Sequence, residues 1–228
     1  MALAECGTQA ILDAVIGPCT TPEVALSRDL AGRLNPGMLV LADRGFYGFG
    51  LWRQAAPTGA DLLWRVKTNL RPRFLKDLSD GSWLAQIIRT SGTDRRTTPP
   101  LTVRVIDYTI EDKRENPASY RLLTTILDPT EASAEGLATV YSERWEIETT
   151  LDELKTHQRG PRSVLRSKSP DLVQQEVWGH LCCHYAIRTL MVDATAHAGR
   201  DPDRVSFVAA LRIARRSVAQ GSFSPSAL

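Results

Sequence analysis

The first third of the chain alternates short apolar runs with helix-like stretches. A β-branched run at 9–16 (QAILDAVI) predicts a strand, and MLVLA at 38–42 predicts a buried central strand because both of its faces are apolar. Between them, the triplet Thr21–Glu23 combines an N-cap, a proline and an early acid, which predicts a helix that runs to about Leu34. A second helix, GLWRQAAP, and a third strand, ADLLWRVK, follow. This order predicts an α/β core with at least one parallel strand pair.

The pattern changes between Leu70 and about Asp128. Prolines and glycines break this region into short segments, among them LTVRVIDYTI and YRLLTTIL, which are typical of strands with polar loops. Three helical stretches follow, at about 133–158, from PDLVQQEV to DATAHA, and through RVSFVAALRIARRSV. We therefore divide the chain into part of an α/β core (1–69), a β-rich insertion (70–130) and helices that complete the core (131–228).

The overall composition excludes little. The 228 residues carry a formal net charge of +2, which is too small to argue for nucleic-acid binding by itself. The sequence contains neither an apolar run long enough to cross a membrane nor an N-terminal secretion signal, so we expect a cytoplasmic protein without a membrane partner. The four cysteines form no C-x-x-C pair, and we expect small, buried, reduced thiols.

The candidate chemistry begins in the stretch YSERWEIETTLDELKTHQ. Tyr141, Arg144, Glu148 and Lys155 follow one another at spacings of three, four and seven, and a helix that turns every 3.6 residues brings these positions close to one stripe. The stripe combines a phenol, a guanidinium, a carboxylate and an ammonium group. Asp43, directly after the run MLVLA, adds a second carboxylate at a predicted strand end.

These groups suit metal-dependent phosphodiester chemistry. The carboxylates of Asp43 and Glu148 can hold Mg²⁺, which prefers oxygen ligands, while arginine and lysine can bind phosphate. In a two-metal site one ion activates the attacking oxygen and the other stabilises the leaving oxygen. Taken singly, Asp43 also suits a turn and Glu148 an ordinary exposed helix position. Their combination with the basic residues favours the site.

The spacing Y-x2-R-x3-E-x6-K resembles the signature of bacterial insertion-sequence transposases of the DDE type, which this chain matches without a gap. Further segments resemble the same family, namely LADRGFYG around Asp43, GADLLWRVK, LRSKSPDLVQQEVWGHL and YAIRTLM. The resemblance covers nearly the whole chain. It implies an α/β fold of the ribonuclease-H-like class with a β-rich insertion. It also implies hydrolysis and strand transfer that join transposon ends to target DNA.

By this resemblance, Asp43 corresponds to the second and Glu148 to the third of three acids that bind two Mg²⁺ ions in such enzymes. Arg144 and Lys155 are expected to contact DNA phosphate near the transposon end, and Tyr141 is grouped with them as a DNA-binding residue. The first acid and the first core strand are expected upstream of the start of this chain.

Two aspartates precede Asp43 in the sequence, and neither Asp13 nor Asp29 lies in a segment that resembles the family's first-acid segment. We therefore expect an N-terminally truncated transposase that is inactive on its own. A core sheet without its first strand is expected to expose a backbone edge.

Two basic clusters point to DNA independently of the family. WRVKTNLRPRFLK and KTHQRGPRSVLRSK each hold five lysines and arginines and no acid, and the second includes Lys155. We expect phosphate contacts that position DNA without reading its sequence; the alternative is a pair of solvated loops. Trp64 and Trp83 suit the core better than stacking on a base. His180 and His184 suit helix packing better than zinc binding.

Three functions remain open from the sequence. The leading hypothesis is a catalytic-domain fragment of a DDE transposase, with transposon-end and target DNA as partners. The second is a noncatalytic DNA-binding or dimerising module that inhibits a full-length transposase, through a homo-oligomer or a mixed assembly. The third is that no selected function remains.

Overall fold

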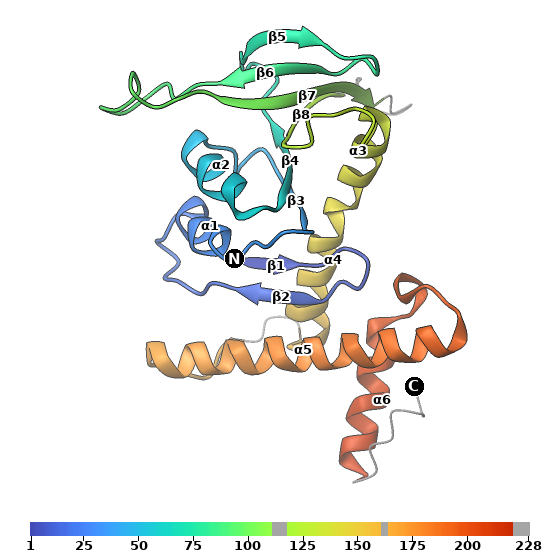
Figure 1. Cartoon of the computed structure of the whole chain (residues 1–228). Coiled ribbons are helices and arrows are strands. Elements are labelled where there is room, and N and C mark those ends of the chain that lie inside the picture. The colour runs from blue at the N-terminus through green and yellow to red at the C-terminus, as the bar shows by residue number, and fades with distance from the viewer. Residues whose placement is uncertain (111–117, 161–163, 221–228) are drawn as a thin grey trace. The chain divides into compact units, whose positions relative to one another are not determined.

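A computed structural model describes residues 1–110, 118–160 and 164–220. The chain divides into two compact units, which are drawn together in Figure 1. Unit 1 combines Met1–Ile16 with Trp145–Leu228, and unit 2 consists of Gly17–Arg144.

Unit 2 is built on a mixed sheet. Within the described residues, six strands lie in the order β3-β4-β8-β7-β6-β5 (Figure 1). Their bounds are β3 Leu39–Ala42, β4 Asp61–Val66, β5 Arg73–Asp77, β6 Trp83–Ile87, β7 Leu101–Ile110 and β8 Ala118–Thr124. The β3–β4 pair is parallel, which confirms the predicted parallel pair, and the other neighbours are antiparallel. The strands β5 to β8 confirm the β-rich character predicted after Leu70.

The position of β3 corrects one prediction. Its apolar composition predicts a central strand buried on both sides, but β3 lies at the edge of the sheet and all four of its residues are only half-buried. An edge strand lacks neighbouring side chains on one flank, and among the described segments only β4 pairs with β3. Half-burial is therefore the expected state of an apolar strand that has one partner.

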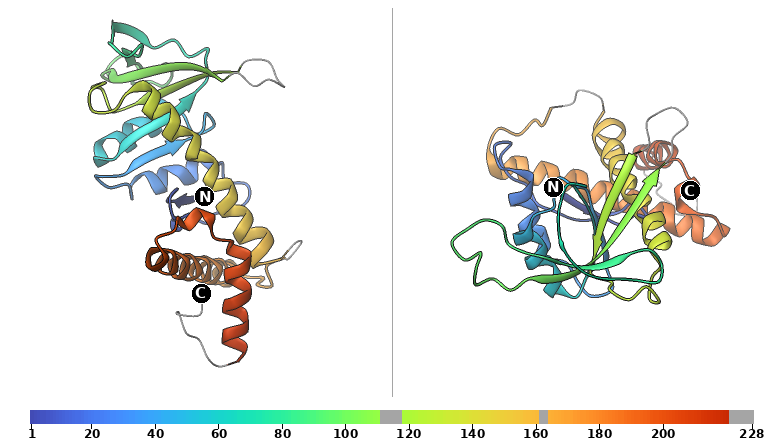
Figure 2. Two further views of the ribbon diagram at one scale, coloured as in Figure 1. Left: turned by 90° about the vertical axis from the view of Figure 1, so that its right-hand side faces the viewer. Right: turned by 90° about the horizontal axis from the view of Figure 1, so that it is seen from above.

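Helices cover both faces of this sheet. They are α1 (Glu23–Ala31), α2 (Phe49–Ala55), the 3₁₀ turn η1 (Ala56–Thr58) and α3 (Ala134–Ser142). Figures 1 and 2 show α2 and α3 on opposite sides of the strands. Trp52 of α2 packs edge-on against Trp64 of β4, with ring centroids 5.0 Å apart. On the other face, Leu137 and Tyr141 of α3 pack against Leu63. Because side chains alternate along β4, Leu63 and Trp64 point to opposite faces of the sheet and pack into different cores.

The start of α1 differs by one position from the prediction. The N-cap position is held by Pro22 and not by Thr21, and no side chain caps the first turn. The N–H of Thr21 instead donates to the carbonyl of Pro18 at 2.9 Å, in a turn that precedes the helix. The helix also ends earlier than predicted, with Gly32 at its C-cap.

Unit 1 joins a short hairpin to a set of helices. Its elements are β1 Ala2–Ala4, β2 Ile11–Ala14, α4 Glu146–Asp152, the π-helical turn η3 Glu153–Gln158, α5 Pro170–Ala198, η4 Pro202–Arg204 and α6 Phe207–Ala219. β1, which the sequence does not signal, pairs with β2 in antiparallel fashion. The hairpin packs on α5 through Ile11, Ala14 and Leu181. A second cluster, in which Met191 meets Phe207, joins α5 to α6.

The helical run that carries the signature is not one regular α-helix. Between α3 and α4 lies a 3₁₀ turn, η2 (Glu143–Trp145), and α4 continues into the π turn η3. The predicted single stripe with a constant period of 3.6 residues is therefore wrong, because the turns before and after α4 have other periods. The π turn brings positions five apart onto one side. Glu153 and Gln158 are both buried in this way, and Gln158 donates through Nε2 to the carbonyl of His180 on α5 at 2.8 Å.

The burial of the tryptophans and cysteines agrees with the sequence predictions only in part. Trp64 is buried, as predicted, and half-buried Trp83 packs against Phe74 with ring centroids 5.9 Å apart. The prediction of buried thiols is wrong, because three cysteines are exposed: Cys19, Cys182 and Cys183. On α5 the buried stripe passes through Leu181 and His184 and leaves the two cysteines between them outside. No helix in the described part of the chain is both long and apolar enough to span a membrane.

Candidate active site

Asp43 lies directly after β3, at the carboxyl end of the strand. The chain turns sharply there, and the N–H of Phe46 donates to the Asp43 carbonyl at 2.9 Å. The side chain is partly exposed, but its Oδ1 atom is buried and has no hydrogen-bond partner among the described residues. Its neighbour is the Nη1 atom of Arg65, at 3.8 Å. A buried carboxylate oxygen without a donor is unusual, because such atoms are nearly always satisfied.

Tyr141 connects the signature helix to this strand end. Its hydroxyl group donates to the carbonyl of Ala42 at 3.2 Å, one residue before Asp43. Burial raises the pKa of Tyr141, and the nearby charge of Arg144 only partly opposes this rise. The phenol therefore stays a neutral donor. The Arg144 guanidinium lies 6.0 Å from the Tyr141 ring centroid. Unit 2 thus brings together three of the predicted site residues, while direct contact of Tyr141 with DNA stays a prediction.

Glu148 and Lys155 belong to unit 1. Glu148 lies in α4 and Lys155 in η3, and both are exposed. Asp43 belongs to unit 2. The shared metal site of Asp43 and Glu148 therefore stays a prediction.

A buried polar network supports the helix that carries Glu148. Within unit 1, Glu153 accepts from the Nε of Arg188 at 3.0 Å and also pairs with the Nη2 atom of Arg188. The Nε2 atom of His184 lies 3.2 Å from the same carboxylate. Arg188 also donates to the side-chain carbonyl of Gln9, and Gln9 donates in turn to the carboxylate of Glu146. The network thus joins the N-terminal hairpin, α4 and α5.

The sequence does carry a signal for this network. Leu181, His184, Arg188 and Met191 follow the buried stripe of α5 at spacings of three and four. An arginine on an apolar stripe requires a buried acceptor, because an unpaired buried charge is very costly. The signal predicts that a partner exists, but it does not identify Glu153.

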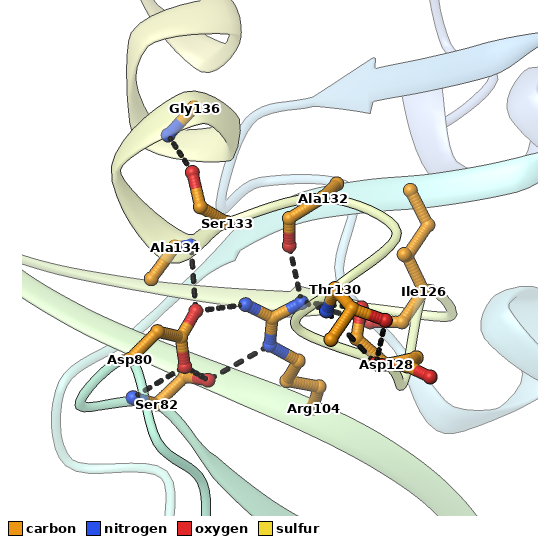
Figure 3. A network of polar contacts seen from close by, with 10 residues as sticks. All are labelled: Asp80, Ser82, Arg104, Ile126, Asp128, Thr130, Ala132, Ser133, Ala134 and Gly136. Atoms are coloured by element: carbon orange, nitrogen blue, oxygen red, sulfur yellow. Dashed lines mark hydrogen bonds and ion pairs between the residues drawn. The ribbon is translucent and has the colours of Figure 1, made fainter.

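A second network fixes the start of α3 in unit 2 (Figure 3). Arg104 of β7 is fully buried and pairs with the carboxylate of Asp80. It also donates to the hydroxyl of Ser82 at 2.8 Å and to the carbonyl of Ala132 at 2.7 Å. Asp80 accepts from the N–H of Ala134, the first residue of α3, at 2.7 Å. The network holds the helix start against the β5–β6 turn and the loop before α3.

The hydrogen bonds of this network favour the ionised form of Asp80. Burial alone would raise the pKa of Asp80. The hydrogen bonds from Ser82 and Ala134, together with the charge of Arg104, outweigh burial and hold the pKa below its ordinary value. Asp80 is therefore a carboxylate across the neutral pH range, and Arg104 has a permanent charge partner.

A row of polar and aromatic side chains continues from Asp43 across the sheet. Arg65 of β4 stacks its guanidinium on the ring of Tyr120, 4.1 Å from the centroid. Tyr120 of β8 stacks in turn on Tyr108 of β7, its cross-strand partner, with centroids 5.2 Å apart. Arg65, Tyr120 and Tyr108 thus come from the adjacent strands β4, β8 and β7, and Asp43 follows the end of the next strand, β3. In the sequence, Arg65 stands out only as one member of a basic cluster.

Comparison with known proteins decides the family. The family model for the transposase DDE domain matches residues 2–186. The chain belongs to the transposase DDE domain family. It is also 29% identical over 197 residues to the transposase InsG of insertion sequence element IS4 from Escherichia coli strain K12. That alignment covers 85% of this chain and 44% of InsG, so the chain spans less than half the length of this relative.

The carboxylates of this transposase DDE domain fit a divalent cation in one respect. Asp43 Oδ1 lacks a hydrogen-bond donor among the described residues, as suits an oxygen that binds a cation. The described residues contain no group of three histidine, cysteine, aspartate or glutamate side chains that could hold a metal ion. The family resemblance implies that three acids hold the metal.

The two basic clusters of the domain lie in different units. The first belongs to unit 2, where Arg73 and Lys76 are exposed on β5. The second belongs to unit 1, and residues 161–163 within it lie outside the described residues. Glu176 of α5 holds part of that segment, because its carboxylate accepts from the N–H groups of Arg166 and Ser167 at 3.1 and 3.0 Å. The hydrogen bonds from Ser167 lower the pKa of Glu176 to about 2. A single DNA surface made by both clusters stays a prediction.

Proposed function

We propose that this chain supplies two acids of the catalytic site of a DDE transposase, which cleaves DNA and joins the ends to a target. Asp43 is the second acid and Glu148 the third, on a ribonuclease-H-like core with a β-rich insertion. The observation that carries the proposal is the buried Oδ1 of Asp43, which has no hydrogen-bond partner among the described residues, at a strand end that Tyr141 holds. Family membership, and a relative named as the transposase of an insertion sequence element, support it.

Asp43 and Glu148 are the residues that would hold the divalent cation, and Mg²⁺ suits their hard oxygen ligands. When bound, the metal supplies activation of the attacking oxygen and stabilisation of the leaving oxygen. The protein's own part is positioning. Tyr141 fixes the end of β3 through the Ala42 carbonyl, and so fixes the backbone from which the Asp43 carboxylate extends. Positioning matters because small displacements of a catalytic group cost large factors in rate.

DNA is the proposed partner, as transposon ends and as target. Arg144 and Lys155 provide positive charge on either side of Glu148 in the chain, and Lys155 is exposed. Such side chains bind phosphate oxygens and fix the position of DNA without reading its sequence. A second copy of this chain or a full-length transposase is a further proposed partner.

The DNA contacts predict a specific change in salt dependence. Replacing both Arg144 and Lys155 with alanine is expected to reduce the slope of log affinity against log salt by about two units, because each phosphate contact contributes close to one. The affinity for a labelled duplex is measured by fluorescence anisotropy over a range of salt concentrations. If both residues only support the helix through local ion pairs, the double variant changes thermal stability and leaves the slope as it is.

The lack of a group of three metal-binding side chains among the described residues favours a second function. In this alternative the chain is a noncatalytic DNA-binding or dimerising module that inhibits a full-length transposase. Both functions predict that the chain alone does not cleave or join transposon-end DNA with Mg²⁺ or Mn²⁺, because the described residues contain no group of three metal-binding side chains. The two functions separate when the chain is added to an active full-length transposase, since only the inhibitor lowers its strand-transfer yield.

Gel analysis of end-labelled DNA checks the inactivity. Strand-transfer products that appear with the wild-type chain and disappear with Asp43→Ala or Glu148→Gln would refute it. Such a result would require another residue, such as Asp13, to provide the third ligand.

A further inference from the structure

Arg65 is held in place without using its hydrogen-bond donors. Its guanidinium stacks on Tyr120 at 4.1 Å from the ring centroid, and Tyr120 is backed by Tyr108. Stacking fixes the plane of an arginine and leaves its five N–H groups pointing outward in that plane. Among the described residues, none accepts a hydrogen bond from the guanidinium of Arg65, although the side chain is only 23% exposed. A partly buried guanidinium without acceptors is poised for a ligand.

The ion pair with Asp43 does not account for this arrangement. Its Nη1–Oδ1 distance is 3.8 Å, whereas a charge-assisted hydrogen bond is about 2.7–2.9 Å long. Other arginines of unit 2 show what a structural arginine does here. Arg104 and Arg121 donate to carboxylates and to backbone carbonyls of their surroundings. Arg65 differs from both, because it lies beside an acid without bonding to it.

We propose that Arg65 binds a phosphodiester group of DNA beside Asp43. The proposal rests on the DNA partner proposed above and deepens it. The guanidinium fork matches two oxygens of a phosphate, and its stack on Tyr120 means that little side-chain freedom is lost on binding. Asp43 Oδ1, which has no hydrogen-bond donor among the described residues, lies 3.8 Å from the Nη1 atom of this guanidinium. Arg65 therefore holds the DNA backbone next to the acid that the reaction uses.

The substitution Arg65→Gln is expected to weaken binding of a short labelled duplex roughly tenfold, since a hydrogen bond to a charged group is lost. It is also expected to lower the slope of log affinity against log salt by about one unit. Binding is measured by fluorescence anisotropy with the full chain in EDTA, so that no metal bridges protein and DNA. The matched control is Arg53→Gln, which removes the same charge from an exposed position of α2, on the other face of the sheet. The control is expected to keep the wild-type slope.

A second pair of variants separates phosphate binding from support of Asp43. Asp43→Asn removes the negative charge beside the proposed phosphate and is expected to tighten binding. Adding Arg65→Gln in this background is expected to weaken binding by the same factor as in the wild type. If the effect of Arg65→Gln disappears once Asp43 is replaced, Arg65 acts only as the partner of Asp43 and the proposal is wrong.

The remaining outcomes also decide the question. Wild-type binding with normal salt dependence, combined with equal slopes for Arg65→Gln and Arg53→Gln, overturns the role of Arg65 and leaves the DNA partner intact. Absence of any DNA binding by the folded wild-type chain refutes the proposed function itself. If Arg65→Gln does not fold, Arg65→Lys is used. It keeps the charge and loses the planar fork, so weaker affinity with an unchanged slope supports the proposal, and unchanged affinity contradicts it.

Discussion

Replacing Arg104 with methionine is expected to lower the free energy of unfolding of unit 2 by about 3–5 kcal/mol. Methionine keeps much of the volume, but it removes the charge partner of the Asp80 carboxylate and leaves the carbonyl of Ala132 without its donor. Breaking one side of a buried ion pair is costly because the remaining charge, here the largely buried carboxylate of Asp80, loses its opposite charge. Hydrogen exchange read by mass spectrometry is the suitable measurement, because it reports each unit separately. Faster exchange is expected first at the start of α3, where Ala134 donates to Asp80.

The matched control for this substitution is Arg89→Met. Arg89 also pairs with an aspartate, Asp94, at 2.8 Å, but both side chains are at least one-third exposed. Exposed pairs contribute about 0.2–1 kcal/mol. Equal losses for the two variants would show that the network around Arg104 carries no special stabilisation.

The substitution Arg188→Met is expected to have a comparable effect on unit 1, again about 3–5 kcal/mol. It leaves Glu153, which is 8% exposed, facing His184 without the bidentate partner, and it removes the donor to Gln9. Because η3 follows α4 directly, hydrogen exchange is expected to rise in the peptide that carries Glu148 as well as in η3.

Arg212→Met is the control that removes a positive charge from unit 1 without touching the buried network. Arg212 is exposed on α6 of the same unit, and its substitution is expected to change stability by less than about 0.5 kcal/mol. If Arg188→Met also leaves the exchange of η3 and α4 unchanged, the buried network does not hold the signature helix.

Local patterns in the sequence account for most elements of the fold but not for their neighbours. The apolar run of β3 correctly predicts a strand, and the Asp43 that follows it lies at the strand end as predicted. Whether that strand is central or at an edge depends on which other segment pairs with it. Periodicity along one strand carries no information about such pairing.

In the signature helix, too, local patterns in the sequence do not predict the contacts of individual side chains. Helical periodicity correctly predicts helical structure from Ala134 to Gln158, but it assumes a constant 3.6 residues per turn. The π turn at Glu153 is associated with a contact to Arg188, which lies 35 residues away in sequence, and Arg188 in turn contacts Gln9 near the N-terminus. The stack of Arg65 on Tyr120 is equally nonlocal. Interactions of this kind cannot be predicted from the residues around each position.

The composition of unit 1 has a consequence for the order of events during synthesis. Ile11 and Ala14 of the hairpin pack against Leu181, so the hairpin leaves the ribosome long before its main packing partner exists. At about 5–20 residues per second, the interval between Ala14 and Leu181 lasts roughly 10–30 s. Unit 2 is contiguous and its residues are all made within that interval, so it can fold first. During this interval the apolar side of the hairpin has no Leu181 to pack against. A chaperone or a neighbouring nascent chain can reach that side in this period.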